Sequence, residues 1–276
     1  MTINCNGKLM DFEVPKVMGI LNCTPNSFYD GGKYTSENAF LKQTEKMLIE
    51  GASIIDIGAY STQPNAPFVS ESEELQRILP VVNALAKEFP EAILSIDTFR
   101  AEVAKQCIEV GASIINDVSA GFLDEKMFEV VGNYKAPYIM MHMKGTPQNM
   151  QKFTDYEDVM KDMMFYFSER IATAKKHGIV DVILDPGFGF SKTLNQNYEV
   201  LNKLELLNEF NLPVLSALSR KSMLYKFLNT EPNEVLNGTT VLHTISLMKG
   251  AKLLRAHDVK EAVECVKLIQ KMYENN

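Results

Sequence analysis

The sequence predicts a single-domain (β/α)8 barrel (TIM barrel), an α/β fold in which eight parallel strands alternate with helices. Apolar runs of about five residues alternate with amphipathic segments of ten to twenty-five residues, which is typical of βαβ units. The length of 276 residues suits such a barrel, which typically fills about 250 residues as one domain. Nearly every apolar run also ends in a polar residue. In a parallel barrel these ends open onto one face, where active sites lie.

Eight apolar runs are the predicted strands. They are rich in Ile, Val, Leu and Met without strict alternation, as expected of parallel strands covered on both faces. In chain order they lie near residues 17–22, 54–58, 93–97, 114–118, 138–142, 182–185, 214–218 and 253–256. Ahead of them, Asn6-Gly7 between two short apolar stretches predicts a hairpin that closes the lower mouth of the barrel.

Helix signals between the strands support this count. Ser70 and Glu73 form a potential capping box, which predicts a helix over residues 70–89. The phrase Gly-Ala-Ser-Ile-Ile occurs at residues 51–55 and 111–115, as expected where a C-terminal glycine ends a helix before the next strand. Apolar faces predict the last two helices at 235–249 and 259–273. They could pack on the barrel or form an interface.

Two connections are longer than the rest, at residues 23–34 and 59–69. Each follows a strand on the face where the polar strand ends meet. Loops of about a dozen residues in an otherwise economical barrel are often lids or binding loops, so we expect both to border the pocket.

Composition excludes several other classes of protein. The net charge of −7 and the scattered Lys and Arg residues disfavour a nucleic-acid surface. The four cysteines are far apart, without a C-x-x-C pair, so neither a zinc ribbon nor a disulfide framework is indicated. No signal peptide and no run of about 18 apolar residues is present. We expect a soluble cytoplasmic protein with no membrane partner.

Polar residues at the strand ends have a chemistry that packing alone does not explain. Asp185 follows three apolar residues and precedes Pro186, so its carboxylate should face the mouth, although Asp-Pro-Gly is also a common turn. Arg255 lies inside the last strand, where its charge must be paired. Lys221 opens a helix, where a cation opposes the helix dipole. These residues predict a pocket for a polar small molecule.

Motifs at these strand ends also carry a resemblance to a known family. MGILNCTPNSFYDGG at residues 18–32, IIDIGAYSTQP, SIDT, IINDVSAG, LDPGFGF, SRKSM and LRAHDV follow in order over essentially the whole length. On these motifs the chain resembles the dihydropteroate synthases, pterin-binding barrels of folate biosynthesis. The resemblance implies a transferase that joins dihydropterin pyrophosphate to p-aminobenzoate, by dissociative loss of pyrophosphate, and it favours a homodimer.

The resemblance also implies where the pterin binds. Asp97, Asn116 and Asp185 would bind its polar edge, since a carboxylate can accept two hydrogen bonds from the amino and ring N–H groups. Met140 would be an apolar wall for the ring, or equally a core residue. Lys221 would reach the pterin carbonyl and a ring nitrogen.

The same resemblance assigns the second substrate and the leaving group. Phe190 would flank the p-aminobenzoate ring, and Ser222 would contact its carboxylate at a helix start. The other implied contacts are Ser219 as a substrate-binding residue, Arg255, His257 and Thr62 for the pyrophosphate, and Asn22 for Mg²⁺. The catalytic residues would be Asp97, Asp185, Lys221 and Arg255.

Three positions depart from the family pattern. Gln63 stands where the family usually has an arginine, and losing such a contact to an anion could cost about 1.5–3 kcal/mol unless a neighbour such as Lys33 compensates. Asn26 replaces a usual aspartate, and Ala217 a common glycine.

Two other hypotheses stand beside a working synthase. A folate-dependent methyltransferase barrel would bind pterin but would lack the arylamine and pyrophosphate sites, and the retained SRKS and RAHD motifs argue against it. A non-catalytic pterin-binding paralogue would be consistent with Gln63. A sugar-phosphate isomerase on this fold would need a Lys and Glu acid-base pair at strand ends, and none is evident.

Overall fold

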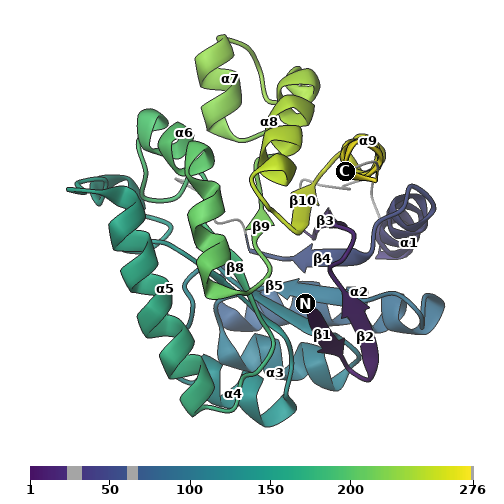
Figure 1. Ribbon diagram of the computed structural model, residues 1–276. Helices are drawn as coiled ribbons and strands as arrows, with labels where there is room; N and C mark the ends of the chain where they lie inside the picture. The colour runs from purple at the N-terminus through teal and green to yellow at the C-terminus, as the bar shows by residue number, and fades with distance from the viewer. Residues whose placement is uncertain (24–32, 61–67, 275–276) are drawn as a thin grey trace.

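The computed structural model describes residues 1–23, 33–60 and 68–274. In this part of the chain, one parallel sheet of eight strands closes on itself and helices surround it (Figure 1). The strand order is β8-β7-β6-β5-β4-β3-β10-β9, and a parallel bridge between Leu184 and Val214 joins the two edges. The predicted (β/α)8 barrel is confirmed.

The barrel strands agree closely with the predicted apolar runs. They are β3 (Lys16–Asn22), β4 (Ile54–Gly58), β5 (Leu94–Asp97), β6 (Ile114–Asp117), β7 (Tyr138–Met141), β8 (Val182–Asp185), β9 (Leu215–Ser216) and β10 (Leu253–Ala256). Only β9 is much shorter than expected. Pro213 has no N–H to donate, and the chain already turns at Arg220, whose φ is 55°.

Helices follow the strands around the barrel (Figure 1). They are α1 (Lys33–Ile49), α2 (Glu71–Glu88), α3 (Ala101–Glu109), α4 (Met127–Tyr134), α5 (Val159–Lys176), α6 (Leu194–Asn202), α7 (Ser222–Leu228), α8 (Leu236–Met248) and α9 (Val259–Tyr273), with 3₁₀ turns at Met150–Lys152 and Leu204–Phe210. Among the helices in the described ranges, none is both long enough and apolar enough to cross a bilayer.

The helix ends show the predicted caps with one difference. Ser70 Oγ accepts a hydrogen bond from the Glu73 N–H, so α2 begins where expected. The Glu73 carboxylate does not complete a capping box, because it pairs with Arg77 one turn later. Gly51 and Gly111 both have a positive φ, as a residue that ends a helix in the left-handed region requires.

The N-terminal hairpin is present and contacts the barrel interior. Strands β1 (Thr2–Cys5) and β2 (Lys8–Asp11) pair antiparallel through Asn6-Gly7, both with positive φ. Ile3 and Phe12 share a buried cluster with Met18 and Leu253 of the barrel strands. In Figure 1 the hairpin lies in front of the strands. The apolar floor that it covers keeps that end of the barrel closed to a polar ligand.

Candidate active site at the barrel mouth

Side chains on the barrel strands alternate between the interior and the helix layer. In β4, Ile54 belongs to the interior cluster, whereas Ile55 and Ile57 belong to the cluster between strands and helices. Asp56 therefore faces inward. The same alternation turns the following residues toward the interior at the carboxyl ends of their strands: Asn22, Asp97, Asn116, Met141, Asp185, Arg255 and His257.

Four of the inward positions lie at one level of the barrel. Register pairs Asn22 with Gly58, Gly58 with Asp97, and Asp97 with Asn116. A Cβ at Gly58 would lie in ordinary contact with the Cβ of Asp97, at 3.4 Å, so the glycine leaves space beside that carboxylate. At this level of the barrel, the amides of Asn22 and Asn116 and the carboxylate of Asp97 therefore border a space, and Gly58 places no side chain in it.

An ion-pair network connects this level of the barrel with Asp56 and Arg255 in the interior. Arg255 donates from Nε to Asp56 Oδ2 at 2.6 Å and from Nη2 to Asp97 Oδ2 at 2.7 Å. Asn116 Nδ2 donates to the same Asp56 oxygen at 3.0 Å. These contacts join strands β4, β5, β6 and β10, so they fix the orientation of the groups at the mouth.

Burial sets the protonation of this network. It raises the pKa of Asp97 to about 7, and the neighbouring Arg255 charge opposes the shift. Burial also works against the Arg255 charge, but Asp56 and Asp97 more than offset it and raise the pKa of the guanidinium. Arg255 therefore stays charged, and its charge stabilises the carboxylate form of Asp97 against the effect of burial.

A second cluster of site residues lies at the ends of β8 and β9. Asp185 is buried, its Oδ1 accepts the Gly187 N–H at 2.7 Å, and burial raises the pKa of its carboxyl. The Lys221 ammonium lies 4.5 Å from the centre of the Phe190 ring. Burial lowers the pKa of Lys221 to about 8, and the Asp185 charge opposes that shift. A carboxylate, a cation and an aromatic face thus meet at one side of the mouth.

The turn after β9 carries further predicted residues. Ser219 Oγ lies 3.0 Å from His257 Nδ1, which joins the ends of β9 and β10. Arg220 binds Asp258 through two nitrogens, at 3.0 and 2.6 Å, and so holds the same two turns together. Ser222 is the first residue of α7 and is partly exposed.

Asn22 is exposed at the end of β3 and offers an amide oxygen, a hard ligand of the kind that Mg²⁺ prefers. Residues 1–23, 33–60 and 68–274 contain no group of three or more His, Cys, Asp or Glu side chains suited to a metal ion. A single oxygen ligand fits an ion that takes its other ligands from water and substrate. Thr62, Gln63 and Asn26 lie outside the described residues, as does the side chain of Lys33.

The structure brings together all but one of the described candidates. Met140 is fully buried in the layer between strands and helices, because inward positions on β7 are Ile139 and Met141. Met141 instead shares a cluster with Phe190 near the mouth. Asp56 was not among the predicted site residues, although it is a polar residue close to the end of β4. Side chains alternate between inward and outward along a strand, and this alternation is the signal that would have placed Asp56 and Met141 in the interior.

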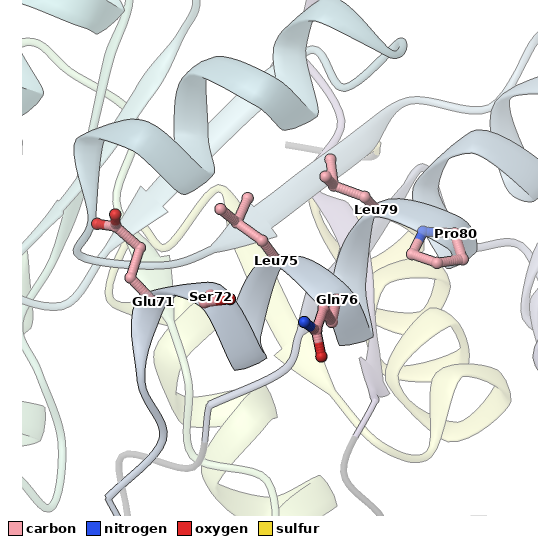
Figure 2. A pocket seen from close by; sticks show the side chains of 6 residues that line it. All are labelled: Glu71, Ser72, Leu75, Gln76, Leu79 and Pro80. Atoms are coloured by element: carbon pink, nitrogen blue, oxygen red, sulfur yellow. The ribbon is translucent and has the colours of Figure 1, made fainter.

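A shallow hollow on the outer surface is separate from this mouth. Figure 2 shows its lining along the first half of α2, by Glu71, Ser72, Leu75, Gln76, Leu79 and Pro80. Its apolar lining comes from Leu75, Leu79 and Pro80, and no described cation lines it. The polar groups suited to a charged substrate converge at the strand ends instead.

Comparisons with known proteins show the family of this chain. The family of pterin binding enzymes matches residues 18–257. Dihydropteroate synthase of Escherichia coli K12 is 43% identical over 272 residues, which are 98% of this chain and 96% of the relative. A Yersinia pestis dihydropteroate synthase solved with a sulfonamide drug superposes with a TM-score of 0.93 at 40% identity, covering 99% and 100% of the two chains. The Xanthomonas albilineans enzyme solved with 4-aminobenzoic acid gives 0.91 at 35% identity, covering 98% and 97%.

The barrel with its polar mouth belongs to the family of pterin-binding enzymes. The matched residues run from β3 to His257. The function of the protein is that of the dihydropteroate synthases, which are transferases of folate biosynthesis.

Proposed function

We propose that the mouth binds dihydropterin pyrophosphate and p-aminobenzoate and joins them into 7,8-dihydropteroate, with release of pyrophosphate. The observation that carries the proposal is the convergence of Asp97, Asn116, Asp185, Lys221 and Arg255 at the strand ends of one barrel. A pterin has a donor edge and an acceptor carbonyl, and this set offers partners for both. The 4-aminobenzoic acid bound to the Xanthomonas albilineans relative supports the second substrate.

The pterin would lie between the inward carboxylates. Asp185 accepts one backbone hydrogen bond at Oδ1, and a carboxylate can accept several more, so it can take the donor edge of the pterin. Asp97 and Asn116 face the same space from β5 and β6. Lys221 would donate to the pterin carbonyl. Met141, rather than Met140, would be the apolar wall for the ring.

The p-aminobenzoate would stack beside Phe190, whose ring is already in contact with the Lys221 ammonium. Ser222 would bind the carboxylate of this substrate, and Ser219 would support the site through His257. This arrangement would orient the amine toward the pterin methylene, which is how binding contributes to a two-substrate reaction.

The pyrophosphate would be stabilised from β10 and β3. Arg255 uses Nε and one Nη2 hydrogen for Asp56 and Asp97, and a guanidinium has five N–H donors, so it retains others for the leaving group. His257 and Thr62 would add donors. Asn22 would hold Mg²⁺, which supplies positive charge to the departing oxygens.

The reaction would begin with cleavage of the C–O bond at the pterin methylene. The electron pair leaves on pyrophosphate, where Arg255 balances the developing charge, and the pterin ring stabilises the resulting cation. The amine of p-aminobenzoate then forms the C–N bond and passes one proton to water or to the released pyrophosphate. A nucleophilic Ser or Cys is not needed.

We also propose the biological setting of the chain. The whole of residues 1–276 would act as one pterin-binding domain, since the hairpin packs into the barrel floor. All four cysteines are free, which suits the reducing cytoplasm. Exposed apolar side chains on α7, α8 and α9, among them Phe227, Met248 and Leu268, suit a homodimer.

The test is pyrophosphate release by the purified protein given dihydropterin pyrophosphate and Mg²⁺, with and without p-aminobenzoate. We expect release coupled to dihydropteroate formation, its loss in Lys221→Ala, and no effect of Lys226→Ala, a control on the exposed side of the same helix. Turnover seen only in Gln63→Arg and not in the native chain would identify a paralogue disabled at residue 63.

A further inference from the structure

Lys192 is a buried lysine that the reaction above does not use. It lies in the connection between β8 and α6, and the residue is 3% exposed. Its Nζ lies 3.0 Å from the carbonyl oxygens of Gly187 and Phe190, 3.0 Å from Nδ1 of His142 and 3.4 Å from the His142 carbonyl. One ammonium therefore joins both ends of the 187–190 turn to the carboxyl end of β7.

The surroundings of this ammonium are unusual for a buried charge. Within the described part of the chain, Lys192 forms no ion pair with a carboxylate. Burial lowers the pKa of Lys192 to about 7, and the Asp185 charge opposes that shift only in part. Burying a cation without a paired anion costs folding free energy. The carbonyl oxygens and the His142 nitrogen around Nζ must therefore be held in place to offset that cost.

The backbone of the turn is arranged around Nζ. Gly187, Gly189 and Ser191 all have a positive φ, with values of 67°, 85° and 44°. A Cβ at Gly187 would lie 2.3 Å from the His142 carbonyl oxygen, so the turn lies directly against the end of β7. This conformation is costly for Ser191, and it points the Gly187 and Phe190 carbonyls to the same atom.

The same turn carries groups of the proposed substrate site. The Gly187 N–H binds Asp185 Oδ1 at 2.7 Å, and the Phe190 ring contacts Lys221. Asn197 of α6 accepts the Gly189 N–H at 2.7 Å, so the turn is fixed from two sides. Ser191 Oγ also accepts the Lys144 N–H at 3.0 Å, just after β7. Loss of the Lys192 ammonium would remove the hydrogen bonds that hold the Gly187 and Phe190 carbonyls beside His142.

We infer that Lys192 is a positioning residue whose ammonium holds residues 187–190 against His142 and thereby sets the Phe190 ring against the p-aminobenzoate site. The inference rests on the proposed function. It concerns the second substrate more than the pterin. Of the three carboxylate and amide residues proposed for the pterin, Asp97 and Asn116 are positioned by Arg255 and Asp56 on other strands, and only Asp185 contacts the turn.

The test compares Lys192→Met and Lys192→Gln with the native chain. We expect KM for p-aminobenzoate to rise tenfold or more, while KM for dihydropterin pyrophosphate and kcat change less than threefold. Amide hydrogen exchange should become faster in residues 187–191, and this second measurement needs no turnover. Val200→Ala in α6 is the control for lost packing, and Lys203→Met is the control for lost charge.

Each outcome decides the inference. Equal losses for both substrates, or an equal change of KM in Val200→Ala, would show that Lys192 acts only through stability. Failure of both variants to fold, judged by circular dichroism, would overturn the positioning role in the same way. Unchanged exchange in residues 187–191 would contradict the proposed contact itself. Inactivity of the native chain would instead refute the proposed function, and exchange would still test the role of the ammonium.

Discussion

Arg255 Nε lies 2.6 Å from Asp56 Oδ2, although the two residues are 199 positions apart in the sequence. Asp56 is completely buried and also accepts from Asn116. It therefore connects the residue proposed for the pyrophosphate with one proposed for the pterin. Together with the direct Arg255–Asp97 pair, Asp56 couples the two proposed subsites of the mouth.

Replacing Asp56 with Asn should weaken both the fold and the activity. The amide cannot neutralise Arg255, and breaking a buried charged contact costs about 3 kcal/mol. We expect that loss in the free energy of unfolding measured in urea, together with a fall in kcat/KM of at least tenfold. Asp162→Asn, which removes a partly exposed pair with Lys144, should cost less than about 1 kcal/mol. Equal effects of the two variants would contradict the special place of Asp56.

The pH dependence of activity should report Lys221. Burial lowers the pKa of its ammonium to about 8, so the charge is complete below that pH and is lost as pH rises through it. We expect kcat/KM for the pterin substrate to fall on the alkaline side with an apparent pKa near 8. Lys221→Arg should lose this alkaline limb because a guanidinium keeps its charge. An unchanged limb in the variant would assign the titration to another group.

The two neighbouring methionines of β7 should differ in what they affect. Met140→Ala should lower the free energy of unfolding by about 2–5 kcal/mol, because it leaves a cavity between strand and helices. Met141→Ala should weaken pterin binding roughly tenfold or more, because an apolar contact at the mouth is lost. Calorimetric titration with a pterin and urea unfolding separate these effects. The reverse pattern would show that Met140 is the residue at the ring.

The proposed homodimer predicts a change of mass on altering α8. Val241 and Met248 are exposed and lie seven residues apart, so they share one face of the helix. Val241→Lys with Met248→Lys should give a monomer by light scattering after size exclusion, whereas Val180→Lys, at another exposed apolar position, should not. A native chain that elutes as a monomer would refute the dimer directly.

Much of this architecture could be predicted from the sequence, because apolar runs and strand-end polar residues are local signals. Asp97 and Asp185 are the last residues of their strands, Asn116 and Arg255 are the last but one, and shared topology is sufficient to bring them together. Prediction was weaker where orientation depends on alternation within a short run. Met140 and Met141 have similar chemistry, and only the register of β7 distinguishes them.

Other features depend on contacts that no local pattern contains. Glu73 has the right spacing for a capping box, but Arg77 competes for its carboxylate. Lys192 looks like a solvated lysine before a helix, and only the path of residues 187–190 encloses it. Gly187 and Gly189 could be read from the LDPGFGF motif, but the motif does not show that the turn surrounds Lys192 Nζ.

The hairpin on the barrel floor has a consequence for synthesis of the chain. Ile3 and Phe12 leave the ribosome long before Leu253 of β10, yet the three residues share one buried cluster. Strand β3 likewise waits for β10, its partner on one side. Such non-local pairings slow folding, since chain closure must precede the contacts that stabilise it. The apolar side chains of the hairpin thus stay without their final partners until β10 has been synthesised, and a chaperone would be most useful to them during that interval.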